Sequence, residues 1–335
     1  MTTTARPLVP ASSSFAESTY GLRLQCPQCG EALDHVMQPL AGGGPLLRCT
    51  ACLFLLCCKD GIWKALPLRR EAHFERFMTE YQIVRAAEGR GSEDSEHYLA
   101  LPDRDLSGRN VSQWAIRART FHYIERNILP TLEATHPNGM GALDLGAGNG
   151  WLSYRLALRG HRPAAIDLLT NAQDGLGAAV HFRQKLPALF PRFQAELDHL
   201  PFAGSQFDLA IFNASFHYSE DYERTLGETI RCLRPGGTLI LADTAWYRRD
   251  ESGQQMLSER RQAFTAEYGF ASDGINSQEY LTDERLASME KRFGMRWRIH
   301  SPFYGVRWAM RPWLAKLRGR REPSQFRIYV AEVGK

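Results

Sequence analysis

The sequence predicts an α/β protein with a doubly wound parallel sheet of seven strands and a small cysteine-rich domain ahead of it. From Gly141 to about Glu332, short apolar runs of strand type alternate with helical patterns, as in a sheet covered by helices on both faces. Six of the seven cysteines fall within 33 residues near the N-terminus. The length of 335 residues suits one large and one small domain, because a single core rarely grows beyond ~250–300 residues.

The composition is that of an ordinary globular protein, with 44% hydrophobic and 23% charged residues. It excludes a mostly disordered, collagen-like or coiled-coil chain. The longest apolar run, Cys52–Cys58, is seven residues, far short of the ~20 needed to span a bilayer. Residues 1–19 are rich in Thr, Ser and Pro and lack an apolar core, so we expect a disordered tail rather than a signal peptide, and a cytoplasmic protein.

Residues 20–67 are predicted to form a zinc-binding domain. Two C-x2-C pairs with 19 residues between them supply four thiolates, Cys26, Cys29, Cys49 and Cys52. A single pair of this kind is equally typical of a redox site, but two at this spacing favour a tetrahedral Zn²⁺ site. The turn Gly42–Pro45 suits a hairpin that returns the second pair to the first. Four thiolates leave no open position, so the metal is expected to be structural.

This segment resembles the small zinc ribbon of tRNA-methyltransferase activator proteins and the ribbon that precedes the catalytic domain of some rRNA guanine methyltransferases. The matching elements are the two cysteine pairs and the segment Lys59–Leu66 after them. The ribbon carries a net charge of only +1, which is weak for gripping phosphates. We expect Cys57 and Cys58 to behave as small apolar residues on the following strand.

Residues 68–135 are predicted as a helical or lid-like linker. Helical patterns cover Arg70–Ala87 and Ser112–Ile128, and Glu88–Asn110 between them reads as a long loop rich in Gly, Ser, Asp and Pro. By analogy, residues 88–105 cover the ligand cleft of the following domain; the alternative is a solvated linker.

Residues 136–335 are predicted to form the large domain. Its candidate strands are Ala142–Leu145, Ala164–Leu168, Phe193–Leu197, Asp208–Asn213, Thr238–Ala242, Arg296–Ser301 and Phe326–Val333. After the first strand, a glycine-rich turn opens a helix at Trp151, with the spacing Asp144-x-Gly146-x-Gly148-x-Gly150. A dinucleotide fingerprint needs glycine where Trp151 stands. This turn instead suits the cationic end of S-adenosylmethionine, through its acidic residue.

Other strand ends carry matching chemistry. The second strand ends in Asp167, whose carboxylate can accept hydrogen bonds from both hydroxyls of a ribose. The third candidate strand runs into Glu196 and a Leu-Pro-Phe segment, the fourth ends in Asn213, and Leu233–Thr238 contains a Pro-Gly-Gly turn before the fifth.

Together these residues, over about 141–245, resemble the class I S-adenosylmethionine-dependent methyltransferases of the type 11 group. The resemblance implies contacts to the amino acid part of the cofactor from Asp144, Gly146 and Gly148, and to the ribose from Asp167. It also implies adenine contacts from Leu168, Glu196 and Leu197, and a place near the sulfonium for Asn213 and Ala214.

A general base is needed only where the acceptor must lose a proton. His217 is the first candidate and Tyr218 the second, because both follow the fourth strand at the ligand-binding edge of the sheet. The alternative for His217 is a packing or gating role. Tyr247, His97 and Tyr98 share the second rank with Tyr218.

A basic insert at residues 305–322 interrupts the pattern near the C-terminus. Residues 301–335 hold eight basic and two acidic side chains, more net charge than the +4 of the whole chain. With Trp308, Trp313, Leu314 and Leu317 interleaved, the insert could form a basic amphipathic helix facing a membrane surface or an anionic substrate. A solvated helix is the alternative.

The sequence therefore predicts a methyltransferase that transfers a methyl group to an O, N or C atom of a small biosynthetic metabolite. A tRNA or rRNA base methyltransferase is the first alternative, suggested by the ribbon and the insert; the near-neutral ribbon counts against it. A non-catalytic adaptor with the same fold is the second, and the intact glycine loop with Asp167 and Glu196 counts against it.

Overall fold

The computed structural model describes residues 19–33, 36–37 and 44–334. All of the predicted tail except Thr19 lies outside these residues, as do Gly42 and Gly43 of the predicted turn.

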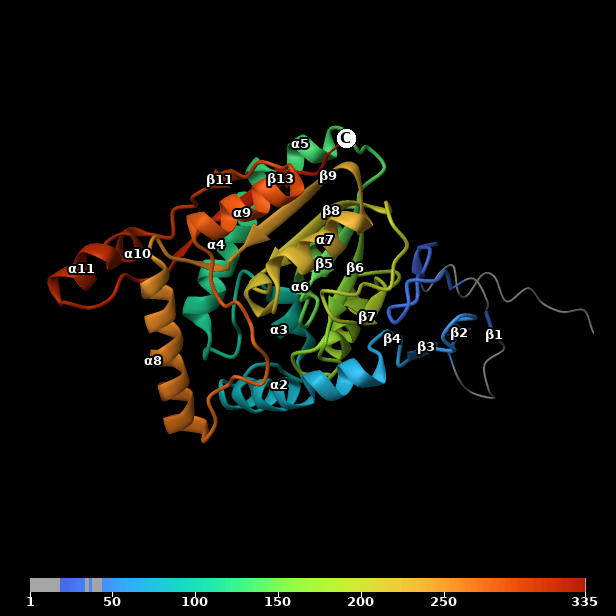
Figure 1. Cartoon of the computed structure of the whole chain (residues 1–335), viewed down its shortest axis with the longest axis horizontal. Helices are drawn as coiled ribbons and strands as arrows, with labels where there is room; N and C mark the ends of the chain where they lie inside the picture. Colours follow the sequence, from blue (N-terminus) through green and yellow to red (C-terminus); the bar gives the residue numbers. More distant parts are fainter. Residues whose placement is uncertain (1–18, 34–35, 38–43, 335) are drawn as a thin grey trace, which may run out of the picture.

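The centre of the molecule is the predicted doubly wound sheet (Figure 1). Its seven strands lie in the order β7-β6-β5-β8-β9-β13-β11. Their bounds are β5 Gly141–Leu145, β6 Arg162–Asp167, β7 Arg192–Gln194, β8 Phe207–Asn213, β9 Leu233–Ala242, β11 Arg298–His300 and β13 Ile328–Glu332. The first five are parallel, and β13 runs antiparallel to both of its neighbours. The sheet is therefore mixed, with five parallel strands and an antiparallel β13 between β9 and β11.

The prediction of seven strands is wrong in one respect: in the described residues the sheet continues to eleven. Four short strands of the cysteine-rich segment extend it: β1 Val36–Met37, β2 Leu46–Arg48, β3 Leu55–Lys59 and β4 Ile62–Lys64. The last of these pairs in parallel with β7, placing Trp63 opposite Phe193. Without β4, β7 would be an edge strand with unpaired backbone groups, and this pairing satisfies them.

The hydrophobic core crosses this junction without a break. Leu56 and Trp63 of the cysteine-rich segment belong to the same buried cluster as Phe193 and Phe202. The Trp63 and Phe193 rings stack with centroids 6.3 Å apart. The two segments therefore share one core, and the predicted domain boundaries at 67 and 135 stay a prediction.

Helices cover both faces of the sheet. Residues of α4 (Val111–Asn127), α6 (Trp151–Leu158) and the 3₁₀ helix η1 (Leu176–Gln184) pack in a buried cluster on one face. Residues of α7 (Tyr222–Cys232) and α9 (Asp283–Phe293) pack in the cluster on the other. The short α5 (Leu129–Glu133) follows α4.

The long helix α2 (Leu68–Ala87) lies across the carboxyl edge of the parallel strands (Figure 1). The predicted loop 88–110 contains a further short helix, α3 (Ser95–Ala100). Its N-terminus is capped by Asp94, whose side chain accepts a hydrogen bond from the Glu96 backbone N–H at 2.9 Å. Local capping chemistry thus orders part of a segment whose composition is typical of loops.

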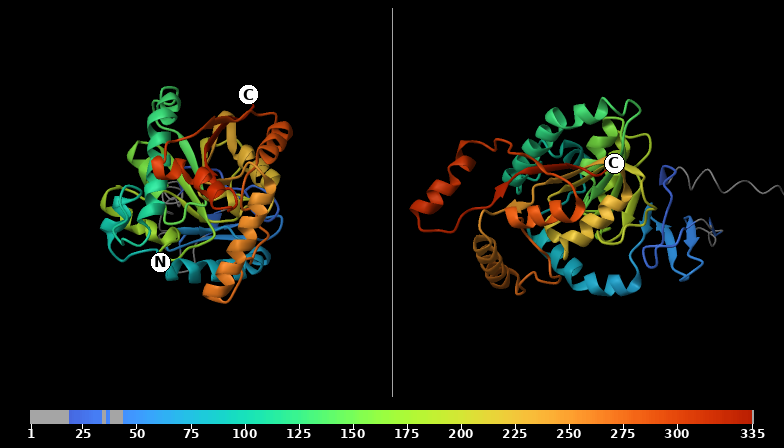
Figure 2. Two further views of the ribbon diagram at one scale, coloured as in Figure 1. Left: turned by 90° about the vertical axis from the view of Figure 1, so that its left-hand side faces the viewer. Right: turned by 45° about the horizontal axis from the view of Figure 1, so that its top comes forward.

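The basic insert is a pair of short helices rather than one helix: α10 (Val306–Ala309) and α11 (Arg311–Leu317). They project from the body beside α8 (Asp250–Tyr268), at the left of Figure 1 and again in the right-hand view of Figure 2. At their base, β10 (Ala245–Trp246) pairs with β12 (Gln325–Phe326). Within the described ranges, no helix has the length and apolar character needed to cross a membrane.

Candidate functional site

A cavity of about 1030 Å³, open to solvent, lies at the carboxyl edge of the parallel strands. It is lined by residues that end or follow four strands, among them Gly146 after β5, Asp167 at the end of β6, Glu196 after β7 and Asn213 at the end of β8. Ligands of open α/β sheets bind at this edge. Of the predicted cofactor residues, the cavity brings together Gly146, Gly148, Asp167, Leu168, Glu196, Leu197, Asn213 and Ala214.

The glycine loop needs its glycines for two different reasons. Gly146 has φ of +72°, and a Cβ there would lie 2.3 Å from Cβ of Ser215, so a side chain cannot fit. Gly148 has φ of +55° and faces the cavity, and a Cβ there would meet only the Asp174 carbonyl oxygen, at 3.5 Å. The loop backbone can therefore approach a ligand closely at Gly148.

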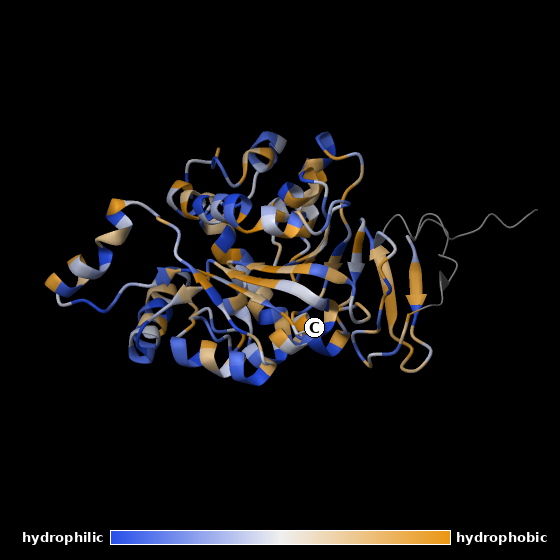
Figure 3. Ribbon diagram, turned by 90° about the horizontal axis from the view of Figure 1, so that it is seen from above, coloured by the Kyte–Doolittle hydropathy of each residue, from blue (hydrophilic) through white to orange (hydrophobic). Residues whose placement is uncertain are grey.

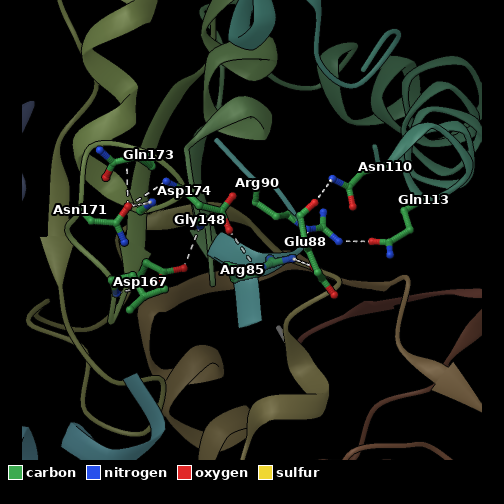
Figure 4. A network of polar contacts seen from close by, with 12 residues as sticks. Arg85, Glu88, Arg90, Asn110, Gln113, Gly148, Asp167, Asn171, Gln173 and Asp174 are labelled. Atoms are coloured by element: carbon green, nitrogen blue, oxygen red, sulfur yellow. Dashed lines mark hydrogen bonds and ion pairs between the residues drawn. The ribbon is translucent and has the colours of Figure 1, made fainter. Parts of the chain in front are cut away.

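Asp167 is held by two backbone donors. Its Oδ2 accepts a hydrogen bond from the Gly148 N–H at 2.8 Å, and its Oδ1 accepts one from the Leu169 N–H at 2.8 Å (Figure 4). Burial raises the pKa of this carboxyl above its ordinary value, and the two backbone bonds oppose that rise. Each oxygen keeps a lone pair for a further donor in the cavity.

Glu196 is buried, with 3% of its side chain exposed, and is held by an arginine of α2. Arg70 donates to it from Nε at 2.9 and 3.0 Å and from Nη2 at 2.7 Å, and His199 lies 3.1 Å away. Burial raises the carboxyl pKa, but the hydrogen bonds from His199 and Arg70 leave it below its usual value. Glu196 is therefore a fixed anion that ties α2 to the cavity.

Asp144 is the one predicted cofactor residue that does not line the cavity. It is buried beneath the glycine loop, where its Oδ2 accepts hydrogen bonds from the backbone N–H and hydroxyl of Ser153, at 3.0 and 2.7 Å. Burial raises its pKa to about 7. These contacts join β5 to the first turn of α6.

The two predicted catalytic residues lie differently. Tyr218 lines the cavity, with its ring 5.7 Å from the rings of both Phe77 and Tyr81, and burial raises its pKa. His217 is not part of the cavity wall. Burial lowers its pKa to about 4, and its Nδ1 has no hydrogen-bond partner in the described part of the chain. At neutral pH, Tyr218 is therefore protonated and His217 is neutral.

Two helices contribute cavity residues that the sequence reasoning missed. From α2 come Phe74, Phe77, Tyr81 and Arg85, and from α4 come Trp114 and Arg117. The α2 residues are spaced by three and four positions, so they share one face of the helix. This spacing is the feature of the sequence that could have identified them as cavity residues. Residues 88–105, the predicted lid, do not line this cavity. The nearest cavity residue in sequence is Arg85, on α2.

Two arginines face the cavity in different ways. Arg85 is paired, with its Nε 2.9 Å from Asp174 Oδ2 (Figure 4). Arg117 has its guanidinium 4.9 Å from the Trp114 ring centre and takes part in none of the ion pairs among the described residues. Burial, together with the charges of Arg85 and Arg90, lowers its pKa to about 10. The charge of Asp243 opposes this shift, and Arg117 is thus a cation of the cavity wall without a direct ion pair among the described residues.

The four predicted metal ligands cluster at the far end of the sheet. The sulfur atoms of Cys26, Cys29, Cys49 and Cys52 all lie within 4.8 Å of one another. Two of the distances are 3.5 Å, between Cys26 and Cys52 and between Cys29 and Cys49. A tetrahedral site with Zn–S bonds of ~2.3 Å needs sulfurs ~3.8 Å apart, so the cluster fits a zinc ion. Cys57 and Cys58 lie on β3, as expected, outside this cluster.

Comparison with known proteins gives a family match: residues 143–241 match the family described as "Methyltransferase domain". Malonyl-[acyl-carrier protein] O-methyltransferase of Erwinia pyrifoliae is 30% identical over 116 residues, 33% of this chain and 40% of that protein. The protein of the same name from Methylococcus capsulatus is 27% identical over 167 residues, 44% of this chain and 50% of that protein. The chain thus spans about half or less of the length of these relatives.

Among solved structures, the 1,6-didemethyltoxoflavin-N1-methyltransferase of Burkholderia thailandensis is 15% identical, with a TM-score of 0.44, and the match covers 90% of this chain and 100% of that one. The family match runs from β5 to β9 and includes β5, β6, β7 and β8, the strands whose ends form the cavity. The cavity therefore lies within the segment that matches a methyltransferase domain.

Proposed function

We propose that the chain is an S-adenosylmethionine-dependent methyltransferase and that the cavity binds this cofactor. The observation that carries the proposal is the convergence of the glycine loop, Asp167 and Glu196 on one cavity inside the matched domain. The lining residues fit this ligand. Their carboxylates can accept hydrogen bonds from hydroxyl and amino groups, and Leu168 and Leu197 can pack against an apolar ring.

In this assignment each residue holds one part of the cofactor. Gly146 and Gly148 let the backbone meet the amino acid part, and Asp167 accepts hydrogen bonds from the ribose. Glu196 accepts from the adenine amino group, while Asn213 and Ala214 lie beside the sulfonium. Asp144 supports this site from beneath through Ser153.

When bound, the cofactor supplies a methyl group already activated by a sulfonium, so the protein chiefly positions the reactants and excludes water. The aromatic wall of Phe77, Tyr81 and Tyr218 does both. We assign Tyr218 a positioning role as a hydrogen-bond donor to the acceptor, because its raised pKa keeps it protonated. We propose His217 as the base only for an acceptor that extends past these three aromatic side chains and contacts the imidazole.

We further propose that the acceptor is a small molecule with an anionic group bound by Arg117. In the described residues, Arg117 is the cation of the cavity wall that lacks an ion pair. A carboxylate or phosphate would complete its bidentate fork and offset the repulsion from Arg85.

A labelled-methyl experiment tests both proposals. The protein is incubated with methyl-labelled S-adenosylmethionine and a nuclease-treated small-metabolite extract, and the products are separated by anion exchange. We expect label in an anionic product. Arg117→Ala should lose most of it while calorimetry finds cofactor affinity retained, and Arg117→Lys should recover part.

The matched control is Arg126→Ala, an exposed arginine on the same helix. Transfer to neutral or cationic products, or full activity of Arg117→Ala, would contradict the anionic acceptor. Failure of the wild-type protein to bind S-adenosylmethionine would contradict the enzyme assignment itself.

We also propose that the cysteine cluster holds a structural zinc ion, as its four thiolates and their spacing support.

A further inference from the structure

The two projecting helices carry a row of apolar side chains that nothing in the described chain covers. We call residues 301–324 the arm. Phe303, Val306, Met310, Trp313 and Leu317 are between 43% and 70% exposed. Large apolar side chains exposed singly are normal, but five in one short segment mark an interaction surface.

Four of these residues, Val306, Met310, Trp313 and Leu317, are spaced by four, three and four positions, which is the spacing of one helix face. Phe303 precedes the two helices in irregular backbone. Met310 joins α10 to α11 in α-helical conformation, with φ of −80° and ψ of −10°, so the periodicity carries across both helices. Figure 3 shows hydrophobic residues along the arm where it stands away from the body.

The opposite side of the arm is fixed to the protein. Trp308 stacks on Phe326 at 5.3 Å and lies 5.5 Å from Tyr304, and Arg311 covers Trp308 at 3.8 Å. The Tyr304 hydroxyl lies 2.9 Å from that of Thr120 on α4. The arm is therefore anchored through its inner side, and folding does not require the exposed row.

Positive charge surrounds the row. Arg307, Lys316, Arg318 and Arg320 are exposed, and none of them takes part in an ion pair among the described residues. Arg321 differs, because it contacts Glu259 at 2.6 Å and serves the fold. A single acidic residue, Glu322, belongs to the arm.

We propose that the arm docks on an anionic lipid surface, with the apolar row entering the headgroup region and the four cations facing the lipid phosphates. Phe303 lines a groove at the base of the arm, whereas Val306, Met310, Trp313 and Leu317 do not line it and project with the arm. A projecting apolar row suits a deformable surface better than a rigid protein face. A tryptophan among aliphatic side chains, ringed by long cationic ones, is typical of interfacial helices.

The base of the arm is connected to the cavity wall through one helix. The arm contacts α4 through Thr120, and α4 carries Trp114 and Arg117 of the cavity wall. The proposal stands on the arm alone and does not depend on the methyltransferase assignment.

Vesicle flotation tests it with the full-length protein. We expect partition into phosphatidylcholine vesicles that contain phosphatidylserine and little into pure phosphatidylcholine. Binding should weaken as salt is raised, because Lys and Arg are attracted to an anionic surface and salt screens that attraction. Trp313→Ser/Leu317→Ser and Arg318→Glu/Arg320→Glu should each lower the partition at least ~tenfold, since each removes two contacts of these kinds.

Leu158→Ser and Arg126→Glu are the matched controls, because both residues are exposed and lie outside the arm. Both should bind like the wild type, and thermal melts should show that all variants are folded. Absence of binding to anionic vesicles at low salt would overturn the proposal, as would full binding by either arm variant. So would light scattering that finds a dimer converted to a monomer by Trp313→Ser/Leu317→Ser, since a second copy would then cover the row.

Discussion

Asp167 is the side chain on which the candidate cofactor site depends most. Two backbone N–H groups orient its carboxylate, one from the glycine loop and one from Leu169. The carboxylate therefore connects the glycine loop after β5 to the end of β6. In the proposed function, its remaining lone pairs accept hydrogen bonds from the ribose hydroxyls.

Replacing Asp167 tests that role. Asp167→Ala should weaken S-adenosylmethionine binding by roughly 1.5–3 kcal/mol, because charge-assisted hydrogen bonds to the ribose are lost. Isothermal titration calorimetry measures the change, with Glu75→Ala, an exposed acid on α2, as the charge-matched control. Unchanged affinity would mean that Asp167 does not meet the ribose.

Asp144 predicts a pH dependence of stability. Its pKa is about 7 in the folded protein, against an ordinary value of 3.8. Between these values the folded state holds a proton that the unfolded state has lost, so this residue makes stability fall as pH rises, by up to ~1.4 kcal/mol per unit. Asp144→Asn removes the titration. Denaturant unfolding at pH ~5 and ~7.5 should therefore find the stability advantage of wild type over variant smaller at the higher pH.

Asp105 supplies a control of opposite sign. Hydrogen bonds from Ser107 and Asn110 outweigh burial and lower its pKa. Its contribution is therefore present at neutral pH and lost as pH falls through the folded value. The advantage of wild type over Asp105→Asn should grow with pH; the same trend for both variants would contradict the assignment of Asp144.

Among the elements, α2 connects the cysteine cluster to the cavity. Three residues separate it from β4, which pairs with β7, and its inner face carries Phe74, Phe77 and Tyr81 to the cavity wall. Arg70 then binds Glu196. A change in the cysteine-rich strands therefore has a short physical path to the proposed cofactor site.

The zinc proposal makes a prediction for this element. Purified under reducing conditions, the protein should contain about one equivalent of zinc. Cys26→Ser should lose the metal and melt at a lower temperature, because metal binding contributes to folding and this segment shares its core with the sheet. Cys57→Ser, outside the cluster, should retain both metal and stability. Elemental analysis that finds no zinc in the wild type would refute the site.

At the scale of the whole molecule, charge distribution separates small-molecule from RNA acceptors. The arm is strongly basic, whereas the cysteine-rich segment carries a net charge of only +1 and lies at the opposite end of the sheet. The charge pattern favours a small acceptor.

Salt dependence tests this reading in the absence of lipid. Six contacts to an RNA backbone would give a log–log slope of activity against salt of about −5, because each neutralised phosphate releases counterions. We expect a shallow dependence instead, since a few screened charges contribute little at a Debye length of ~8–10 Å. Tight, salt-sensitive binding of bulk RNA, lost in Arg318→Glu/Arg320→Glu, would favour the RNA alternative.

The sequence by itself determined the doubly wound sheet, the glycine loop, the strand-end acids and the four cysteines. These features are local: strand and helix patterns repeat within a few residues, and parallel strands bring their carboxyl ends to one edge whatever else the chain does. For this reason local sequence patterns were enough to predict eight of the nine cofactor residues that line one cavity or lie beneath it; those eight line the cavity.

Only the tertiary structure decided the direction of Asp144, the contribution of α2 and α4 to the cavity, and the continuation of the sheet into the cysteine-rich strands. Asp144 is turned beneath the loop because Ser153 offers two donors there, and Trp63 meets Phe193 across 130 positions of sequence. Such contacts depend on which surfaces remain unsatisfied once the elements have formed. Strand edges, buried charges and apolar faces each need a partner that is distant in sequence. Local sequence patterns do not show which segment supplies that partner.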